Sequence, residues 1–266
     1  MWDQHVHTCF SGDCEAAPEA MIEKAIELGL SGLCFTDHID LDYKEEPGYF
    51  DLDLVAYSHK ILGLKETFSK LLPIHMGVEL GLQPHVAEQN SVIAAALPFD
   101  FIIGSTHCVD QKDIYYPSFH ESYTPEESFE KYFLATLENV KTFHDYDVYG
   151  HLDYIARYVP NQSVPFSYRD YSDLIDAILK SIIEDGKGIE MNMSGYRYGL
   201  GMPNPCPDIL KRYRELGGEI ITVGSDAHTP ENVGLRFEKA GEHLVQAGFK
   251  YYTVWKERKP VFIKIC

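Results

Sequence analysis

Histidines and carboxylates recur along this chain in short groups whose composition suits metal binding. The first group is His5-Val6-His7, in which two histidines are separated by one residue. The other members are Asp13, His38, Glu79, His107, His151, Asp226 and His228. Imidazole and carboxylate ligands together suit zinc, iron or manganese, whereas sites made only of oxygen suit magnesium or calcium. The residue types therefore predict a site for zinc, manganese or iron.

The number of candidates exceeds what one ion requires. A catalytic ion takes about three protein ligands, and the chain offers nine. We therefore expect two to three divalent ions, with a carboxylate such as Glu79 or Asp226 bridging neighbouring ions. Ions held a few Å apart generate a hydroxide at neutral pH and stabilise both oxygens of an in-line phosphoryl displacement. The ligand set predicts a polynuclear hydrolase that attacks its substrate with a metal-bridging hydroxide.

The groups fall where predicted strands end. Short β-rich runs are predicted for the residues ending at His7 and for residues 32–36, 74–80, 101–105, 148–151, 188–192 and 219–224. Amphipathic stretches with helical spacing alternate with them, at residues 17–28, 54–71, 85–96, 125–144, 171–185, 207–216 and 231–247. In parallel α/β folds the carboxyl ends of the strands form the rim where active sites are built. A single histidine at a strand end is usually a core residue, but so many marked ends are hard to explain by chance.

The strand–helix alternation also predicts the organisation of the chain. It runs without a Pro/Gly/Ser-rich linker, so we expect one α/β domain over residues 1–266 with a parallel sheet. A final segment, residues 250–265, is β-like but contains Pro260 and several charges, which is typical of an edge strand or a cover. The alternation alone is compatible with a doubly wound sheet and with a barrel.

Charge and composition narrow the function classes. The net charge is −18 with histidines neutral, which disfavours nucleic acid as a general partner because phosphates would be repelled. The chain opens without a basic and apolar leader, and no apolar run approaches the ~20 residues that span a bilayer. The six cysteines show no CxxC spacing and are expected to be reduced thiols. We expect a cytoplasmic protein without membrane contact.

The successive motifs resemble those of a known superfamily. They are His5-x-His7, Thr36-Asp37-His38, Gly77-Val78-Glu79, Ser105-Thr106-His107, Gly150-His151-x-Asp153 and Ser225-Asp226-x-His228. In this order, and over nearly the whole chain, they are similar to the motifs of the PHP (polymerase and histidinol phosphatase) superfamily. The resemblance implies a distorted (β/α)7 barrel with a trinuclear site at its C-terminal rim.

The resemblance also implies which residues share an ion. One ion would take His5, His7, Glu79 and Asp226. A second would take Glu79, His107 and His151. A third would take Asp13, His38 and His228. Many members of the superfamily carry a histidine where Asp13 stands, and the aspartate is more similar to the histidinol-phosphatase branch.

Two arginines favour a phosphorylated small molecule as substrate. Arg157 and Arg197 follow the fifth and sixth predicted strands, where a guanidinium can bind phosphate in a bidentate manner. The alternative is that each pairs with a surface acid. The runs Gly-His-x-Asp-Tyr followed by Arg, and Ser-Gly-Tyr-Arg, resemble the histidinol-phosphatase branch, which implies hydrolysis of L-histidinol phosphate.

Additional roles are expected for two of the candidate ligands and for two other carboxylates. Asp226 or His228 would protonate the leaving oxygen, and the sequence does not decide between them. Asp37 and Asp153 are expected to orient His38 and His151.

Two other functions stay open at this point. One is a PHP phosphoesterase acting on nucleotides, oligonucleotide ends or phosphotyrosine, although oligonucleotide cleavage should come with a basic track that the sequence lacks. The other is a non-catalytic metal-binding PHP module. The complete set of candidate ligands and the expectation of no further domain argue against the second.

Overall fold

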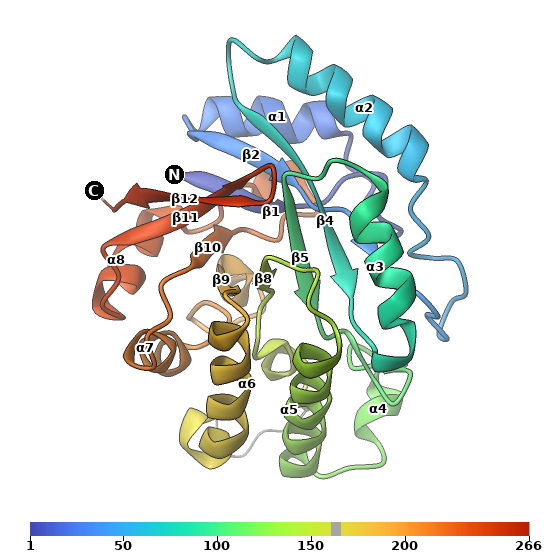
Figure 1. Cartoon of the computed structure of the whole chain (residues 1–266), viewed down its shortest axis with the longest axis vertical. Helices are drawn as coiled ribbons and strands as arrows, with labels where there is room; N and C mark the ends of the chain where they lie inside the picture. The colour runs from blue at the N-terminus through green and yellow to red at the C-terminus, as the bar shows by residue number, and fades with distance from the viewer. Residues whose placement is uncertain (161–165, 266) are drawn as a thin grey trace.

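The computed structural model describes residues 1–160 and 166–265, and its centre is a parallel sheet. Seven strands follow one another in the order of the chain (Figure 1): β1 (Trp2–Val6), β2 (Gly32–Phe35), β4 (Ile74–Gly81), β5 (Phe101–Ser105), β8 (Val148–Tyr149), β9 (Gly188–Asn192) and β10 (Ile221–Gly224). Every neighbouring pair is parallel. The short β3 (His38–Ile39) adds to β4 beyond the end of β2.

The sheet closes on itself just past the carboxyl ends of its outer strands. A parallel bridge joins Val6 to Ala227. The backbone N–H of His7 donates to the carbonyl of Ala227 at 2.9 Å, and the N–H of Asp226 donates to the carbonyl of His5 at 2.8 Å. The first and last strands therefore meet at residues from two of the ligand groups, and the predicted distorted (β/α)7 barrel is confirmed.

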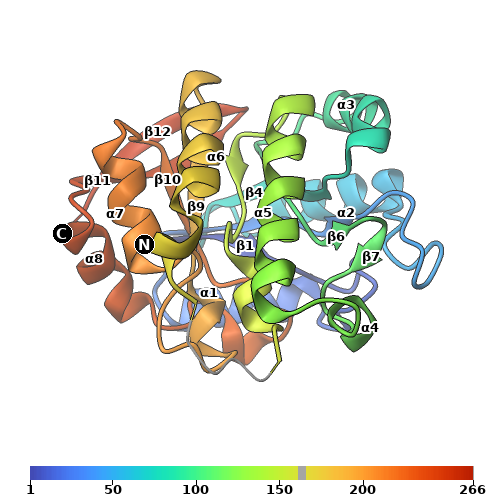
Figure 2. The ribbon, with the colours of Figure 1, turned by 90° about the horizontal axis from the view of Figure 1, so that it is seen from below.

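The predicted helices surround this sheet. They are α1 (Pro18–Glu27), α2 (Leu54–Thr67), α3 (Ala87–Ala96), α5 (Pro125–Thr142), α6 (Ser172–Glu184), α7 (Pro207–Glu215) and α8 (Phe237–Gln246). Helices α5 and α6 pack side by side outside β8 and β9 (Figure 2). Among the described residues, none of the helices has the length and apolar character that crossing a membrane would require.

Local chemistry explains where these helices begin. Thr124 and Glu127 form a reciprocal capping box at the start of α5, with Pro125 in the first turn. The last helix begins later than predicted, because residues 230–236 form a 3₁₀ turn and a loop instead. Arg236, just before α8, adopts a left-handed backbone with φ of 56°, which a continuous helix excludes.

An insertion that the sequence did not predict follows β5. It contains a small hairpin, β6 (Cys108–Val109) and β7 (Lys112–Asp113), and the one-turn helix α4 (Pro117–His120). Asp110 and Gln111 join the two strands with φ of 52° and 62°, as in a two-residue hairpin turn. Strands of two residues are too short to produce a recognisable periodicity, which explains why they could not be predicted from the sequence.

The final segment forms a hairpin that covers the amino-terminal end of the barrel. It consists of β11 (Tyr251–Lys256) and β12 (Lys259–Lys264), paired antiparallel. Asp100 and Asp147, which precede β5 and β8, accept hydrogen bonds from the N–H of Glu257 and from Nε of Arg258. Of the two expected roles, this segment takes that of a cover.

Gln4 connects β1 to this cover. Its side chain is buried, donates to the carbonyl of Thr253 at 2.6 Å and accepts from the N–H of Trp255 at 3.0 Å. We predict that Gln4→Ala lowers the free energy of unfolding by about 1–3 kcal/mol, because two buried backbone groups lose their partners. Denaturant unfolding measures this. Gln89→Ala, at an exposed position on α3, is the control and should change stability little; equal losses in both variants would contradict the role given to Gln4.

Candidate metal centre

Glu79, on β4, lies at the centre of the carboxyl-terminal rim. Its side chain is fully buried, and each of its two oxygens faces a different set of histidines. Oε2 lies near His5 Nε2 at 3.1 Å, His38 Nδ1 at 3.3 Å and His7 Nε2 at 3.5 Å. Oε1 lies near His151 Nε2 at 2.9 Å and His107 Nε2 at 3.4 Å. A carboxylate placed in this way can bridge two neighbouring ions.

Asp226 supplies a second carboxylate from the loop after β10. Its Oδ1 lies 3.5 Å from His7 Nε2 and 3.6 Å from His228 Nδ1. Its backbone is left-handed, with φ of 55°, a region that residues other than glycine seldom occupy. Such conformations persist where the surrounding structure holds them, and they concentrate at functional sites. Here the hydrogen bond from its N–H to the carbonyl of His5 fixes the turn.

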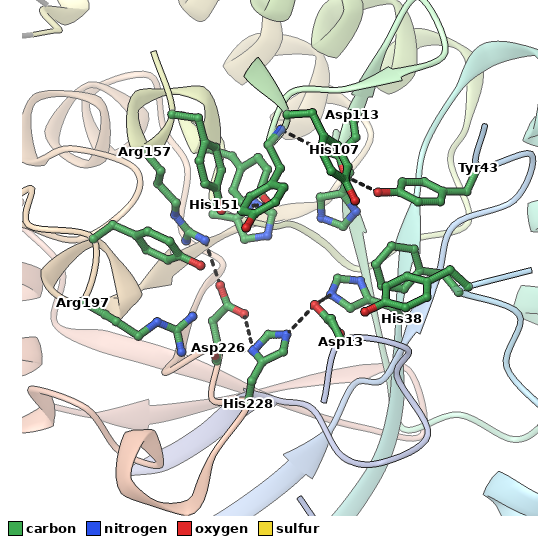
Figure 3. A pocket seen from close by; sticks show the side chains of 17 residues that line it. Asp13, His38, Tyr43, His107, Asp113, His151, Arg157, Arg197, Asp226 and His228 are labelled. Atoms are coloured by element: carbon green, nitrogen blue, oxygen red, sulfur yellow. Dashed lines mark hydrogen bonds and ion pairs between the residues drawn. The ribbon is translucent and has the colours of Figure 1, made fainter. Parts of the chain in front are cut away.

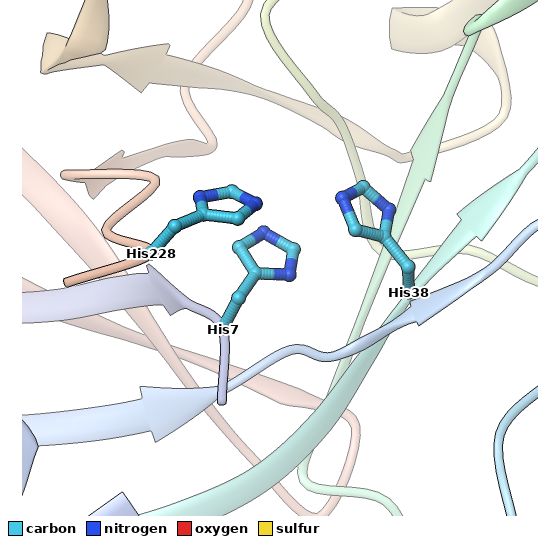
Figure 4. Close-up of side chains that lie close together, drawn as sticks. All are labelled: His7, His38 and His228. Carbon is cyan, nitrogen blue, oxygen red and sulfur yellow. The ribbon is translucent and has the colours of Figure 1, made fainter. Parts of the chain in front are cut away.

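Asp13 completes a third group near the surface. Its Oδ2 lies 3.0 Å from His228 Nε2 and 3.8 Å from His38 Nε2 (Figure 3). The ring of His7 stacks between those of His228 and His38, with centroid distances of 4.2 and 4.3 Å (Figure 4). The expected third set of ligands is therefore brought together, with His7 beside it.

All nine predicted ligands thus meet at one end of the barrel, but they do not fall into separate sets. Ligand atoms lie within 4.8 Å of one another in four overlapping groups: His5-His7-Glu79, His5-His151-Asp226, His38-Glu79-His107 and His7-His38-His228. His5, His7, His38 and Glu79 each belong to more than one group. Of these four residues only the Glu79 carboxylate can bind two ions at once, so each histidine would serve one ion and the ions would lie close together.

Several ligand atoms of the cluster lie close together or lack hydrogen-bond partners, as is expected of a site that binds divalent ions. Nε2 of His5 and Nε2 of His7 lie 2.9 Å apart, so a single proton at most can lie between them. Among the described residues, His38 Nδ1, Asp40 Oδ2 and His151 Nδ1 are buried without a hydrogen-bond partner. A buried polar atom without a partner is costly, and a cation bound within the cluster would remove that cost for the atoms that face it.

The electrostatic field of the cluster matches this arrangement. Burial alone would lower the pKa of His5, but Glu190, Glu79 and Asp226 raise it well above the ordinary value. Burial opposes ionisation of Glu79, yet His5 and other histidines hold its pKa well below the usual range. Burial, with His228 and His38, lowers the pKa of His7. Glu79 is therefore ionised and His7 is neutral, the forms in which they bind metal, whereas His5 favours its protonated form, and a bound ion would have to displace the proton on its Nε2.

Two buried carboxylates that the sequence did not single out support the histidines. Asp40 accepts from Nδ1 of His107 at 2.7 Å and lies 3.4 Å from Nδ1 of His38. Glu190, on β9, lies 2.7 Å from Nδ1 of His5. Asp40 stands two residues after His38, a predicted ligand, and Glu190 two residues before Asn192, which ends the predicted strand 188–192. The twofold alternation of strands would have placed them on the same face.

Two expected supporting roles are wrong. Asp37 accepts hydrogen bonds from the backbone and hydroxyl of Thr8 and from the hydroxyl of Ser11, so it organises the loop after β1 and does not orient His38. Asp153 accepts from the Asn204 side chain at 2.6 Å and from the Cys206 N–H at 2.8 Å, and does not orient His151.

The two predicted arginines line the same pocket but differ in how their side chains are engaged by neighbouring residues. Arg157 is buried and donates to Asn204 at 2.9 Å, to Asp226 Oδ2 at 3.1 Å and to Asn192 at 3.2 Å. Arg197 stacks on the Tyr198 ring at 5.1 Å and makes no side-chain hydrogen bond or ion pair within residues 1–160 and 166–265. Neither arginine pairs with a surface acid, so that alternative is wrong.

These side chains open into a pocket of about 460 Å³ (Figure 3). Predicted ligands line one part of it, including Asp13, His38, His107, His151, Asp226 and His228, and both arginines line another. The remaining wall is aromatic, made by Tyr43, Tyr49, Phe50, Tyr115, Tyr116, Tyr154, Tyr158 and Tyr198, with the carboxylate of Asp113 among them. The β6–β7 insertion supplies Asp113, and the segment that follows it supplies Tyr115 and Tyr116. The pocket therefore combines a ligand cluster, cations and an apolar wall at the scale of a small molecule.

Known proteins are similar to this chain in sequence. A family model described as the PHP domain matches residues 3–194. A probable histidinol-phosphatase from Clostridium acetobutylicum is 35% identical over 240 residues, which cover 90% of this chain and 91% of that protein. The histidinol-phosphatase of Lactococcus lactis is 31% identical over 249 residues, 93% of this chain and 91% of that protein.

A solved structure gives the same result in three dimensions. The crystal structure of histidinol phosphate phosphatase from Lactococcus lactis, complexed with zinc, L-histidinol and phosphate, matches with a TM-score of 0.90 and 30% identity and covers 98% of each chain. The barrel, the ligand cluster at its rim and these relatives agree: the chain belongs to the PHP domain family.

Proposed function

We propose that residues 1–266 act as one catalytic domain that hydrolyses L-histidinol phosphate to L-histidinol and phosphate. The observation that carries this proposal is the pocket, in which a polynuclear ligand cluster faces two arginines. The fold around it matches, over nearly its whole length, an enzyme whose crystal structure holds zinc, L-histidinol and phosphate. The described cysteines are free, which supports a cytoplasmic location, and the reaction would belong to histidine biosynthesis.

Nine residues are assigned to two to three divalent ions, zinc, manganese or iron. They are His5, His7, Asp13, His38, Glu79, His107, His151, Asp226 and His228. When bound, ions of this kind polarise phosphoryl oxygens and lower the pKa of water enough to provide a nucleophile at neutral pH. The chain contributes a rigid, buried frame that holds the ligands in place before substrate arrives.

The arginines are assigned to the phosphate in unequal roles. Arg197 has its hydrogen-bond donors available, so it binds phosphate oxygens directly. Arg157 lies between the rings of Tyr154 and Tyr198, at 4.8 Å from each, and three of its five donors are already used. It therefore holds Asp226 in place and offers only its remaining donors to substrate.

The proton for the leaving oxygen is better assigned to His228 than to Asp226. The Asp226 carboxylate accepts from Arg157, Asn192 and Ser194, which favours its ionised form. His228 lines the pocket, and its Nδ1 donates to the carbonyl of Asp226 at 3.0 Å. Its Nε2, which lies 3.0 Å from Asp13 Oδ2, therefore carries a proton to donate only in the imidazolium form. Nε2 cannot hold an ion and a proton together. The donor role is thus an alternative to the ligand role given to His228 above, and it would leave the third ion to Asp13 and His38.

The far wall of the pocket suits the organic end of the substrate. Aromatic rings stack with a flat imidazole, and Asp113 adds an acceptor for an amino or imidazole N–H. The Asp113 carboxylate is held by the Tyr43 hydroxyl and the Tyr115 N–H, each at 2.7 Å.

The first test compares substrates and removes the metals. Phosphate release from L-histidinol phosphate should exceed that from nucleotides and phosphotyrosine. It should stop after chelation and return when zinc or manganese is added back. Activity that survives complete metal removal would overturn the metal mechanism. Nucleotide turnover that is faster by orders of magnitude would overturn the substrate assignment.

A second test separates the two arginines. Arg197→Ala should lower kcat/KM by about 10- to 100-fold, the loss of a hydrogen bond to a charged group, with an unchanged melting temperature. Arg157→Ala should lower both kcat/KM and the melting temperature, because Asp226, Asn192 and Asn204 lose a buried partner. Arg169→Ala, on the surface, is the control. If Arg197→Ala and Arg169→Ala behave alike, Arg197 does not bind the phosphate.

A third test addresses the bridging carboxylate. Glu79→Gln should bind at least one fewer zinc ion per chain than the wild type, and its kcat should fall by about 100-fold or more. Elemental analysis of the purified protein and steady-state kinetics measure the two effects. Glu66→Gln, at an exposed position on α2, should retain the wild-type zinc content. Full zinc content in Glu79→Gln would exclude Glu79 as a ligand.

A further inference from the structure

One buried carboxylate has no part in the reaction proposed above. Glu190 lies on β9 with 1% of its surface exposed. Its Oε1 contacts Nδ1 of His5 at 2.7 Å. Its Oε2 accepts from the backbone N–H of His151 at 3.0 Å and from the Asn192 side chain at 3.1 Å. A single carboxylate thus connects two residues that come from different strands of the barrel.

The neighbouring strands leave room for this carboxylate. Gly224 ends β10, and a Cβ atom added there would lie 2.4 Å from Oε1 of Glu190 and 2.3 Å from Cβ of His5. Gly150 follows β8, and a Cβ atom added there would lie 2.4 Å from Oγ of Ser105. A larger residue at position 224 would therefore displace Glu190 or His5, whereas one at position 150 would displace Ser105 and reach Glu190 Oε2 only at 3.5 Å. The glycine at position 224 is the one that leaves room for the Glu190 carboxylate.

The contacts fix the protonation pattern of His5. The donors on Oε2 are a backbone N–H and an amide NH₂, so that side of Glu190 must accept. An ionised carboxylate accepts on both oxygens, and Nδ1 of His5 must then donate to Oε1. Glu190 therefore holds the proton on Nδ1, and Nε2 is the atom that can give up its proton and offer a lone pair to a metal ion. That atom faces Glu79 Oε2 at 3.1 Å and His7 Nε2 at 2.9 Å.

The same carboxylate also holds the backbone of His151. This residue has φ of 21°, outside the regions that residues with a side chain usually adopt. Its Nε2 lies 2.9 Å from Oε1 of Glu79, on the side of the cluster opposite to the Glu79 oxygen that faces His5. Holding the N–H of His151 therefore holds a second candidate ligand at the other oxygen of Glu79.

From these contacts we infer that Glu190 is a positioning residue for metal binding: it sets the tautomer of His5 and the backbone of His151 together. Carboxylates that accept from the second nitrogen of a ligating histidine typically change metal affinity by about 10- to 100-fold. Glu190 differs from a simple partner of that kind because it acts on candidate ligands at both oxygens of Glu79. The inference rests on the metal site proposed above.

The isosteric variant Glu190→Gln tests it. Gln carries one acceptor and one donor, so an oxygen that serves His151 and Asn192 leaves an NH₂ group facing Nδ1 of His5. Nδ1 must then accept, and the proton moves to Nε2, where it opposes a metal ion. We expect zinc affinity to fall by about 10- to 100-fold, measured by titrating metal-stripped protein with Zn²⁺ against a chromophoric chelator. Nitrogen NMR of the metal-free protein should show Nδ1 of His5 protonated in the wild type and unprotonated in Glu190→Gln.

Asp147→Asn is the matched control. Asp147 is also a buried carboxylate, but it accepts from Ile102 and Arg258 at the amino-terminal end of the barrel. It should lose stability and keep zinc affinity. Glu190→Asp, which keeps the charge but shortens the side chain, is a second variant should Glu190→Gln not fold. Its zinc affinity should be lower than that of the wild type, by less than the 10- to 100-fold loss expected for Glu190→Gln.

The outcomes separate this inference from the proposed function. Wild-type protein that binds no Zn²⁺ would refute the metal site itself. Wild-type protein that binds Zn²⁺, with equal affinity in Glu190→Gln, would refute only the role of Glu190. Loss of stability in Glu190→Gln without loss of zinc affinity would likewise assign Glu190 to the fold and not to the site.

Discussion

The burial of Glu79 is the constraint on which the rest of the rim depends. A carboxylate without exposed surface is costly unless positive charge and hydrogen-bond donors surround it. In this chain that environment consists of five histidines from four other strands or strand ends, arranged around two oxygens. Because they come from so many strands, only a sheet curved into a barrel can bring them to one point. The closed curvature of the sheet is therefore a condition for the chemistry of the site.

The chain meets this requirement with small local adjustments at strand ends. Glycines at positions 150 and 224 make space inside the rim, and the left-handed backbone of Asp226 aims a carboxylate back at the cluster. Each adjustment costs stability. The apolar layer between sheet and helices, with fully buried rings such as those of Tyr57 and Phe133, offsets that cost. Packing and chemistry thus occupy different parts of the barrel, the outer layer and the rim.

The sequence predicted the features that depend on regular spacing. Strands and helices were located to within a few residues, and the candidate ligands were found because their residue types recur at strand ends. The directions in which side chains point were harder to predict. Asp37 lies between β2 and β3, directly before His38, but its carboxylate turns to Thr8 and Ser11, so closeness in sequence placed Asp37 in the wrong role. Asp40 and Glu190 were missed although the twofold alternation put them on the correct face. The β6–β7 insertion left no periodic signal, so its contribution to the pocket could only be seen in three dimensions.

The closure of the barrel between β1 and β10 has a consequence for how the protein matures. His5 and His7 are synthesised long before Asp226 and His228, which follow the last strand of the barrel. Once residue 151 has been made, a growing chain holds seven of the nine candidate ligands without being able to complete the cluster. The complete cluster therefore forms only after the ends of the barrel have joined, and a chain that stops short of Asp226 lacks two candidate ligands. In this architecture a full set of ions would mark a molecule whose barrel is finished.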